Sequence, residues 1–152
     1  MKLQTGAKLW SFTAQDQVRC SPAVSNGVVY VGAGGSDHNL YALDAKTGAK
    51  LWNYTANNYV SSSPTVVNDV VYVGSWDGNV YAFNATTGDK LWSYVTGDAI
   101  DSSPAYANGV IYIGTWSSGF YALDTTTGHQ LWHYATGSVP PAGAATAPSP
   151  VE

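Results

Sequence analysis

Few residues in this sequence have the types and spacing that catalysis or metal binding requires. His129 and His133 lie four positions apart, and imidazoles are common metal ligands. They fall in a predicted strand, where four residues span about 13 Å at roughly 3.3 Å per residue, too far to share one ion. Cys20 is the only cysteine, which excludes an internal disulfide. No Ser/His/Asp set or carboxylate pair can be assembled, so we predict no catalytic residue, metal site or cofactor.

Aromatic and acidic residues in predicted loops form a stronger candidate for binding. Trp76 and Trp116 occupy equivalent loops, Asp77 follows the first of them, and Tyr59 and Asp98 lie in segments that link successive units. Clustered aromatic side chains on rigid loops favour contacts with protein or carbohydrate, and the two carboxylates would suit a cation. The alternative is that each indole only covers a neighbouring unit and each aspartate only shapes a turn. These five residues form our candidate binding face.

A repeat positions these residues. The stretch Thr-Gly-x-x-Leu-Trp occurs four times, beginning at Thr5, Thr47, Thr87 and Thr127, with its glycines 42, 40 and 40 residues apart. A fixed period of this size indicates an array of similar supersecondary units. Each unit contains four short apolar segments separated by turn residues, and no helical periodicity competes with them. In the middle unit we predict strands at residues 60–67, 70–75, 79–84 and 89–94.

The first two strands of each unit are joined by a two-residue hairpin signal. Asn-Gly and related pairs favour a type I′ turn, because they tolerate positive φ at both central positions. The pairs are Asn26-Gly27, Asn68-Asp69 and Asn108-Gly109. The second and third strands are joined by the Trp-containing loops, where the first unit has two additional residues.

Four antiparallel strands in about 40 residues, too small a sheet to bury its own faces, are typical of a β-propeller blade. We therefore predict an all-β fold of three full blades and one spare N-terminal outer strand. The predicted boundaries are 1–12 for the spare fourth strand, 13–54, 55–94 and 95–136 for blades 1 to 3, and 137–152 for a Pro/Ala-rich tail or linker.

Composition and charge exclude several classes of partner. The net charge is −4, only 11% of residues are charged, and no cluster of Lys and Arg occurs. Nucleic acids and anionic membrane surfaces both require concentrated positive charge, so neither is an expected partner. No apolar run approaches the roughly 18 residues that a membrane span needs. The sequence Met1-Lys2-Leu3-Gln4 leads into a repeat without a signal-peptide core.

The residues of the repeat resemble those of a known family. The pattern Ala-x-Asp-x-x-x-Gly-x-x-x-Trp is similar to the tryptophan-docking motif of PQQ-type (quinoprotein-like) β-propeller repeats, and the resemblance extends over about residues 5 to 136. It implies that the tryptophan packs on the adjacent blade while the aspartate and glycine shape the turn between the third and fourth strands. The motif residues are Ala42, Asp44, Gly48, Trp52, Ala82, Asn84, Gly88, Trp92, Ala122, Asp124, Gly128 and Trp132.

The resemblance implies a binding module rather than an enzyme. Quinoprotein dehydrogenases of this type hold the quinone and a calcium ion with a dedicated set of acidic, Asn and Arg residues, and many have a vicinal disulfide. This sequence has one cysteine and one arginine, Arg19. Non-enzymatic relatives include an outer-membrane assembly scaffold and sensor domains. By this resemblance we expect an exported, periplasmic or cell-surface protein.

Three blades are too few to close a ring, since propellers have about four to eight. The open blade faces, rich in Trp, Tyr and Val, would exceed the few hundred Å² of apolar patch that a soluble monomer usually exposes. We therefore expect copies to complete a ring, most simply a dimer of six blades, or to form a filament. The spare strand would pair with a neighbouring chain. The alternatives are a fragment of a larger PQQ-dependent enzyme and a purely structural or designed repeat.

Overall fold

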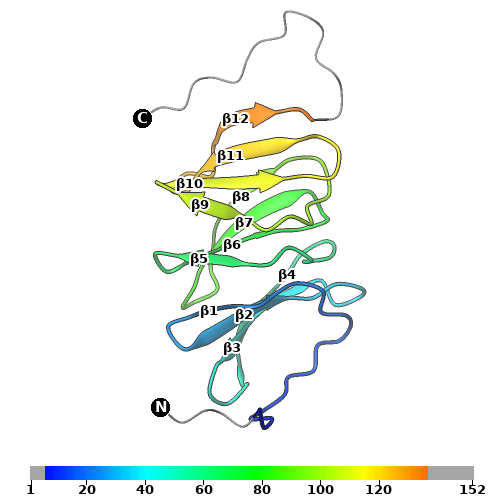
Figure 1. Cartoon of the computed structure of the whole chain (residues 1–152), viewed down its shortest axis with the longest axis vertical. Coiled ribbons are helices and arrows are strands. Elements are labelled where there is room, and N and C mark those ends of the chain that lie inside the picture. Colours follow the sequence, from blue (N-terminus) through cyan, green and yellow to red (C-terminus); the bar gives the residue numbers. More distant parts are fainter. Residues whose placement is uncertain (1–5, 137–152) are drawn as a thin grey trace, which may run out of the picture.

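The protein is described by a computed structural model covering residues 6–136, in which three four-stranded antiparallel sheets follow one another along the long axis of the molecule (Figure 1). In each sheet the strands are hydrogen-bonded in chain order. Blade 1 contains β1 (Ala23–Ser25), β2 (Val28–Gly32), β3 (Asn39–Asp44) and β4 (Lys50–Thr55). Blade 2 contains β5 (Thr65–Val67), β6 (Val70–Gly74), β7 (Asn79–Asn84) and β8 (Lys90–Val95). Blade 3 contains β9 (Ala105–Ala107), β10 (Val110–Gly114), β11 (Phe120–Asp124) and β12 (Gln130–Tyr134).

The predicted all-β propeller-blade fold is confirmed, but the spare outer strand predicted at residues 1–12 is not: its described part, residues 6–12, forms no strand. The predicted tail, residues 137–152, lies outside the described residues. Every regular element in residues 6–136 is a strand. Over the same residues, the structure has no helix with the length and hydrophobicity that crossing a membrane requires. The innermost strands β1, β5 and β9 lie beside one another, so the blades are arranged around a common inner side.

The predicted hairpin turns are present between the first and second strands of each blade. Asn26 has a φ of +48° and Gly27 a φ of +75°, and Asn68 and Asp69 have φ values of +51° and +58°. Both central residues are therefore left-handed, as a type I′ turn requires. This turn places the side chains of β1 and β2 in register, with Ser25 opposite Val28.

The first strand of the middle unit is shorter than predicted. We expected a strand over residues 60–67, whereas β5 spans only Thr65–Val67. Pro64 cannot donate a backbone hydrogen bond to a ladder. Two residues earlier, the Ser62 hydroxyl accepts a hydrogen bond from the Gly74 amide at 3.1 Å. This stretch therefore runs beside β6 through a side-chain contact, without strand pairing.

A bulge lies at the same place in the outer strand pair of each sheet. In blade 1, Ala42 is paired with Trp52 while Leu43 is paired with Lys50, which leaves Leu51 without a partner of its own. A bulge of this kind re-aims the neighbouring side chains. The bulge leucines are turned to solvent in every blade. Their exposed fractions are 52% for Leu51, 51% for Leu91 and 51% for Leu131.

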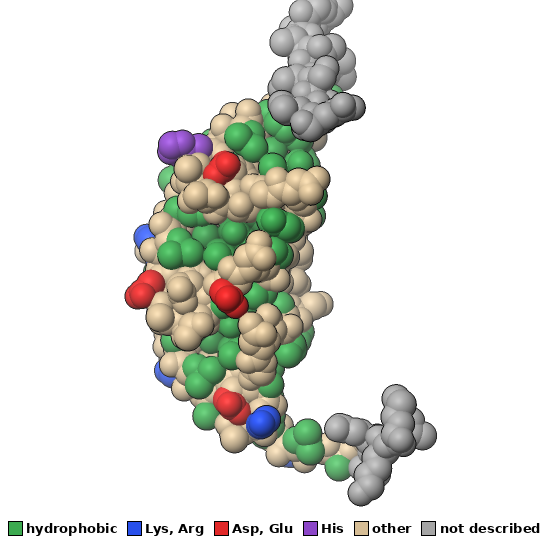
Figure 2. All heavy atoms as spheres, turned by 90° about the vertical axis from the view of Figure 1, so that its left-hand side faces the viewer, with side chains coloured by type: hydrophobic (Ala, Val, Ile, Leu, Met, Phe, Trp, Pro, Cys, Tyr) green, Lys and Arg blue, Asp and Glu red, His purple; other side chains and the backbone are tan. Residues whose placement is uncertain are grey.

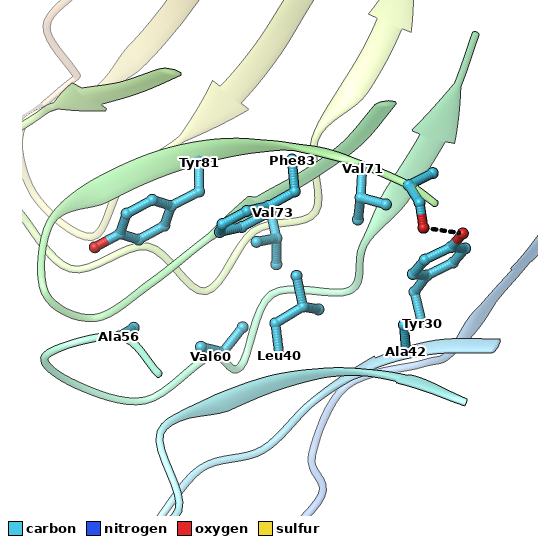
Figure 3. Packing of buried hydrophobic residues seen from close by; sticks show 10 residues of the cluster. Tyr30, Leu40, Ala42, Ala56, Val60, Val71, Val73, Tyr81 and Phe83 are labelled. Atoms are coloured by element: carbon cyan, nitrogen blue, oxygen red, sulfur yellow. Dashed lines mark hydrogen bonds between the residues drawn. The ribbon is translucent and has the colours of Figure 1, made fainter. Parts of the chain in front are cut away.

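The hydrophobic core lies between blades. Figure 3 shows Leu40, Tyr30 and Ala42 of blade 1 facing side chains of blade 2. The Tyr30 hydroxyl crosses this interface and donates a hydrogen bond to the Ala85 carbonyl at 3.0 Å. A single sheet buries neither of its faces, so stacking is what removes these side chains from water. The residues that complete this cluster are Ala56, Val60, Val71, Val73, Tyr81, Phe83 and Ala85.

Candidate functional site

The turn between the third and fourth strands is held by the acidic residue of the motif. Asp44 Oδ1 accepts hydrogen bonds from the Lys46 amide at 2.9 Å, the Thr47 amide at 2.8 Å and the Thr47 hydroxyl at 2.9 Å. These bonds, led by the Thr47 hydroxyl, hold the pKa of Asp44 below its usual value. The turn ends at Gly48, whose φ is +74°. Asn84 and Asp124 hold the equivalent turns of the other blades.

The tryptophans of the outer strands β4 and β8 lie on the turn of the following blade. The Trp52 indole donates a hydrogen bond to the Ala85 carbonyl at 3.0 Å. Its ring covers Gly88 so closely that a Cβ at this glycine would lie 2.7 Å from Trp52 Cδ2. A glycine is therefore required there both for its positive φ, +78°, and for the approach of the ring. The same arrangement joins Trp10 to Ala45 and Gly48, and Trp92 to Thr125 and Gly128.

Trp132 lies on the outer strand of the last described blade. Within residues 6–136 its indole makes no hydrogen bond. The rings of Tyr112 and Phe120 lie 6.0 and 6.1 Å from it. Phe120 is 39% exposed, whereas Leu40 and Val80, its counterparts in blades 1 and 2, are 0% exposed. We call Tyr112, Phe120 and Trp132 the open face of blade 3.

Aromatic rings from four connecting segments form a continuous row, which we call the aromatic ladder: His38, Tyr59, Trp76 and Trp116. The centroid distances along it are 5.6, 5.1 and 5.4 Å. Asp101 accepts hydrogen bonds from both indoles, from Trp76 at Oδ1 and from Trp116 at Oδ2, the latter at 2.8 Å. Trp116 is 68% exposed, so this end of the ladder presents an indole to solvent.

Asp77 is engaged in its own blade. Its carboxylate accepts hydrogen bonds from the Tyr81 hydroxyl at 2.6 Å, the Asn79 amide at 3.0 Å and the Asn57 amide at 3.1 Å. Burial raises the pKa of Asp77, but the hydrogen bonds from Tyr81 and Asn79 outweigh it and hold the pKa below its usual value. Burial and the neighbouring carboxylate raise the pKa of Tyr81. The group therefore ties the linking segment to the loop of blade 2.

Asp98 ties down the corresponding loop of blade 3. Its Oδ2 accepts hydrogen bonds from the Ser118 amide at 2.8 Å and from the Ser117 amide and hydroxyl. The Ser117 amide is the main cause that lowers the pKa of Asp98. Ser117 stands where blade 2 has Asp77, so in this blade the carboxylate comes from the linking segment instead.

Of the five residues in the candidate binding face, the structure brings Tyr59, Trp76 and Trp116 into contact. The two aspartates, by contrast, hold loops through the bonds just described. Sequence reasoning missed Asp101 and the place of His38 in the ladder. Asp101 stands where the other units have Ser61 and Arg19, so the repeat gave no signal for it.

The histidines of the last blade are separately engaged. The His133 ring stacks on Tyr121 with a centroid distance of 4.2 Å, and its Nε2 donates to the Ser118 carbonyl at 2.7 Å. His129 lies in the turn, where its amide donates to the Thr127 hydroxyl. The part of the chain that the structure describes contains no group of three or more His, Cys, Asp or Glu side chains placed to hold a metal ion.

Cys20 takes the place that serine has in the other units. The Gly32 amide donates to Cys20 Sγ at 3.1 Å, as the Gly74 and Gly114 amides do to Ser62 and Ser102. Burial raises the pKa of the Cys20 thiol, which opposes formation of the reactive thiolate. The Cys20 side chain is partly exposed.

Stacked four-stranded sheets with a tryptophan of one sheet on the glycine turn of the next define a protein of the PQQ-type β-propeller class. The chain belongs to the family described as outer membrane protein assembly factor BamB, which matches residues 1–151. Among curated proteins, none matches this sequence.

Solved structures with the same fold include enzymes, a scaffold and a designed protein. The chain is 29% identical to quinohemoprotein alcohol dehydrogenase ADHIIG from Pseudomonas putida HK5, with a TM-score of 0.73. It is 25% identical to BamB from Moraxella catarrhalis, with a TM-score of 0.71. Each match covers 84% of this chain, but only 22% of the dehydrogenase and 39% of BamB.

A third structure is the computationally designed Ika4 protein, which is 22% identical with a TM-score of 0.73. That match covers 88% of this chain and 83% of Ika4, and at this identity it shows a shared fold alone.

Proposed function

We propose that this chain is a non-catalytic binding or scaffolding propeller module that completes its ring by self-association. The observation that carries the proposal is the exposure of Phe120 in the open face of blade 3. Its counterparts in blades 1 and 2 are fully buried by the next blade. A face that is built like an internal interface but exposed to water favours association with a further blade. The family, named for an outer membrane assembly factor, supports a scaffolding role in an exported protein.

Tryptophan docking is the means of association in this proposal. Three indoles of the chain each meet a carbonyl and a glycine of the following blade. Trp132 is the fourth such residue, and it projects from the last described outer strand. A blade supplied by another copy would offer this indole the same two groups.

Size-exclusion chromatography coupled to light scattering tests self-association. The expected result at micromolar concentration is a defined oligomer, with six blades if two chains close a ring. An open filament would instead give a mass that rises with concentration and does not level off. A stable monomer across the concentration series would contradict the proposal.

The aromatic ladder supports a second role for the module, the binding of a protein or carbohydrate. Its rings come from four connecting segments, and Trp116 at its end is largely exposed. Because Asp101 accepts from both indole N–H groups, a ligand would meet ring surfaces and a carboxylate rather than free donors. Tryptophan fluorescence of the wild type and of Trp116→Ala, titrated with oligosaccharides and with peptides, would test this role. An unchanged wild-type signal in both titrations would count against it.

The competing candidate is a fragment of a larger quinoprotein-like enzyme. The identity of 29% to an alcohol dehydrogenase, of which the match covers only 22%, favours it. This candidate requires tight binding of PQQ together with calcium. Titration of the protein with both, followed by absorbance, separates the two functions: saturable binding supports the enzyme, and the module predicts none.

A further inference from the structure

The N-terminal segment makes the same contacts with blade 1 that β4 and β8 make with the blades that follow them. The Trp10 indole donates to the Ala45 carbonyl at 3.0 Å, and its ring lies over Gly48. Two residues later, Phe12 meets Tyr41 edge-on at 4.9 Å. The docking position of blade 1 is therefore already filled from within the same chain. We call residues 6–12 the cap segment; they run past blade 1 near the N-terminal end of the molecule (Figure 1).

The cap segment covers blade 1 incompletely. On β2, Val29 and Val31 remain partly exposed. Their counterparts in β6 and β10 are each at most 1% exposed: Val71, Val73, Ile111 and Ile113. A full blade covers this face completely, whereas a single segment does not. Replacing the segment by a complete blade would therefore bury more apolar surface and be favoured by the hydrophobic effect.

The cap segment is also held by few bonds. Residues 6–12 form no strand, and no backbone–backbone hydrogen bond involves them within the described chain. The strand β12, which carries Trp132, is paired along its length with β11. When the cap segment and an outer strand compete for one position, the segment that is not hydrogen-bonded to a neighbouring strand costs less to release. Displacement of the cap segment is therefore favoured over displacement of β12.

We infer that residues 6–12 are a displaceable cap on the surface of blade 1 that receives blade 3 of a second copy, so that Trp132 of one chain takes the place of Trp10 of the other. The inference rests on the proposed self-association, and it adds that the cap segment regulates how tightly two copies associate. A binding site that is open for only a fraction of the time has its apparent affinity reduced by that fraction. The cap thus weakens an association that the two blade faces would otherwise make.

Sedimentation velocity across a concentration series tests the cap in the whole chain and its variants. A variant lacking residues 1–12 is expected to associate at least about tenfold more tightly than the wild type, since the receiving site is then always open. Trp10→Ala, which leaves the chain length unchanged, is expected to shift the affinity in the same direction. Trp132→Ala is expected to weaken association in both backgrounds. Leu9→Ala is the matched control, because Leu9 is 77% exposed and should leave the affinity unchanged.

Three results would overturn the inference, and they are distinguishable. If the wild type associates and cap removal leaves the affinity unchanged, the cap does not compete. If removal weakens association, the segment instead completes the partner's blade. If neither the wild type nor the variant lacking residues 1–12 associates, the proposed self-association itself fails. Circular dichroism on each variant establishes that the β-sheet content is retained.

Discussion

Two surfaces of this molecule are built from equivalent residues and differ in whether a neighbour covers them. Between blades 2 and 3, Val80 and Tyr72 are almost fully buried. On blade 3 their counterparts Phe120 and Tyr112 remain partly exposed. The difference does not come from polarity, because the exposed pair is at least as aromatic as the buried one. The two blades therefore have equivalent apolar faces, and only the face that a neighbouring blade packs on is buried.

The largest expected difference separates two equivalent tryptophans. Trp92→Ala should lower the free energy of unfolding by about 3 kcal/mol, the lower end for an aromatic residue packed in an interface. Trp132→Ala should cost only about 1 kcal/mol in the dilute monomer, because within residues 6–136 no blade follows β12 to cover this indole. Urea unfolding of both variants at low protein concentration measures the two costs. Equal losses of unfolding free energy in the two variants would contradict the difference between the covered face of blade 2 and the open face of blade 3.

The glycine beneath each indole gives the next comparison. Gly88→Ala and Gly27→Ala both place alanine at positive φ, at a cost of about 1–2 kcal/mol each. At Gly88 the new Cβ also meets the Trp52 ring, whereas at Gly27 nothing lies within 4 Å. This overlap should add about 2 kcal/mol to the cost of Gly88→Ala. Thermal or urea unfolding of the pair isolates the contact, and an equal loss would show that the ring moves aside freely.

A smaller effect is expected where the loops of blades 2 and 3 differ. Asp77→Asn should destabilise the protein by about 1.5 kcal/mol at neutral pH, because charge-assisted hydrogen bonds to Tyr81 and Asn79 are weakened. The pKa of Asp77 is lowered in the folded protein, so its contribution is present above the usual carboxyl pKa of about 3.9 and is lost as the pH falls below it.

Unfolding free energies measured from neutral pH down through this range should therefore fall more steeply for the wild type than for Asp77→Asn. Parallel pH profiles would contradict the role of this carboxylate. The pKa of Asp98 is also lowered. The pH dependence of unfolding can therefore be compared in the same way between the wild type and Asp98→Asn.

The smallest effect is expected at Cys20. Cys20→Ser introduces the residue that Ser62 and Ser102 already provide at equivalent positions. The change in unfolding free energy should stay within about 0.5 kcal/mol. A larger loss would show that the first blade depends on the thiol in a way that the other two do not.

The repeated elements were predictable from sequence because each rests on local chemistry. The hairpin at Asn26-Gly27 depends on residues that accept positive φ, and its φ angles are as expected. The first strand of the middle unit was predicted too long. The apolar pattern does not reveal that Ser62 contacts the neighbouring strand β6 through a side-chain hydrogen bond. Local pattern therefore predicts turns and strand order better than it predicts where strand pairing starts.

The loop face was only partly predictable. Tyr59 and Trp76 were expected on one face because they lie in loops at the same end of the blades, and their rings are in contact. Asp101 was missed, because its role depends on two indoles that come from different blades. Contacts of this kind depend on how neighbouring blades are placed in space, which residue type alone does not reveal.

Charge on the surface is sparse and dispersed. Figure 2 shows a few acidic and basic side chains spread over the face it presents, with one acidic and one basic side chain side by side near its lower end. Electrostatic repulsion between like-charged copies is screened beyond a Debye length, about 8 Å at physiological salt. A net charge of −4 is therefore a weak barrier to self-association compared with burial of an aromatic face.

The central claim is that the open face of blade 3 is an interface, and one substitution tests it most directly. Phe120→Glu places a charge on that face. Leu131→Glu places the same charge at the bulge position, whose leucine faces solvent in every described blade. Light scattering at matched concentrations should show an oligomer for the wild type and for Leu131→Glu, and a folded monomer for Phe120→Glu. An oligomer that survives Phe120→Glu, or a wild type that stays monomeric, would contradict the account.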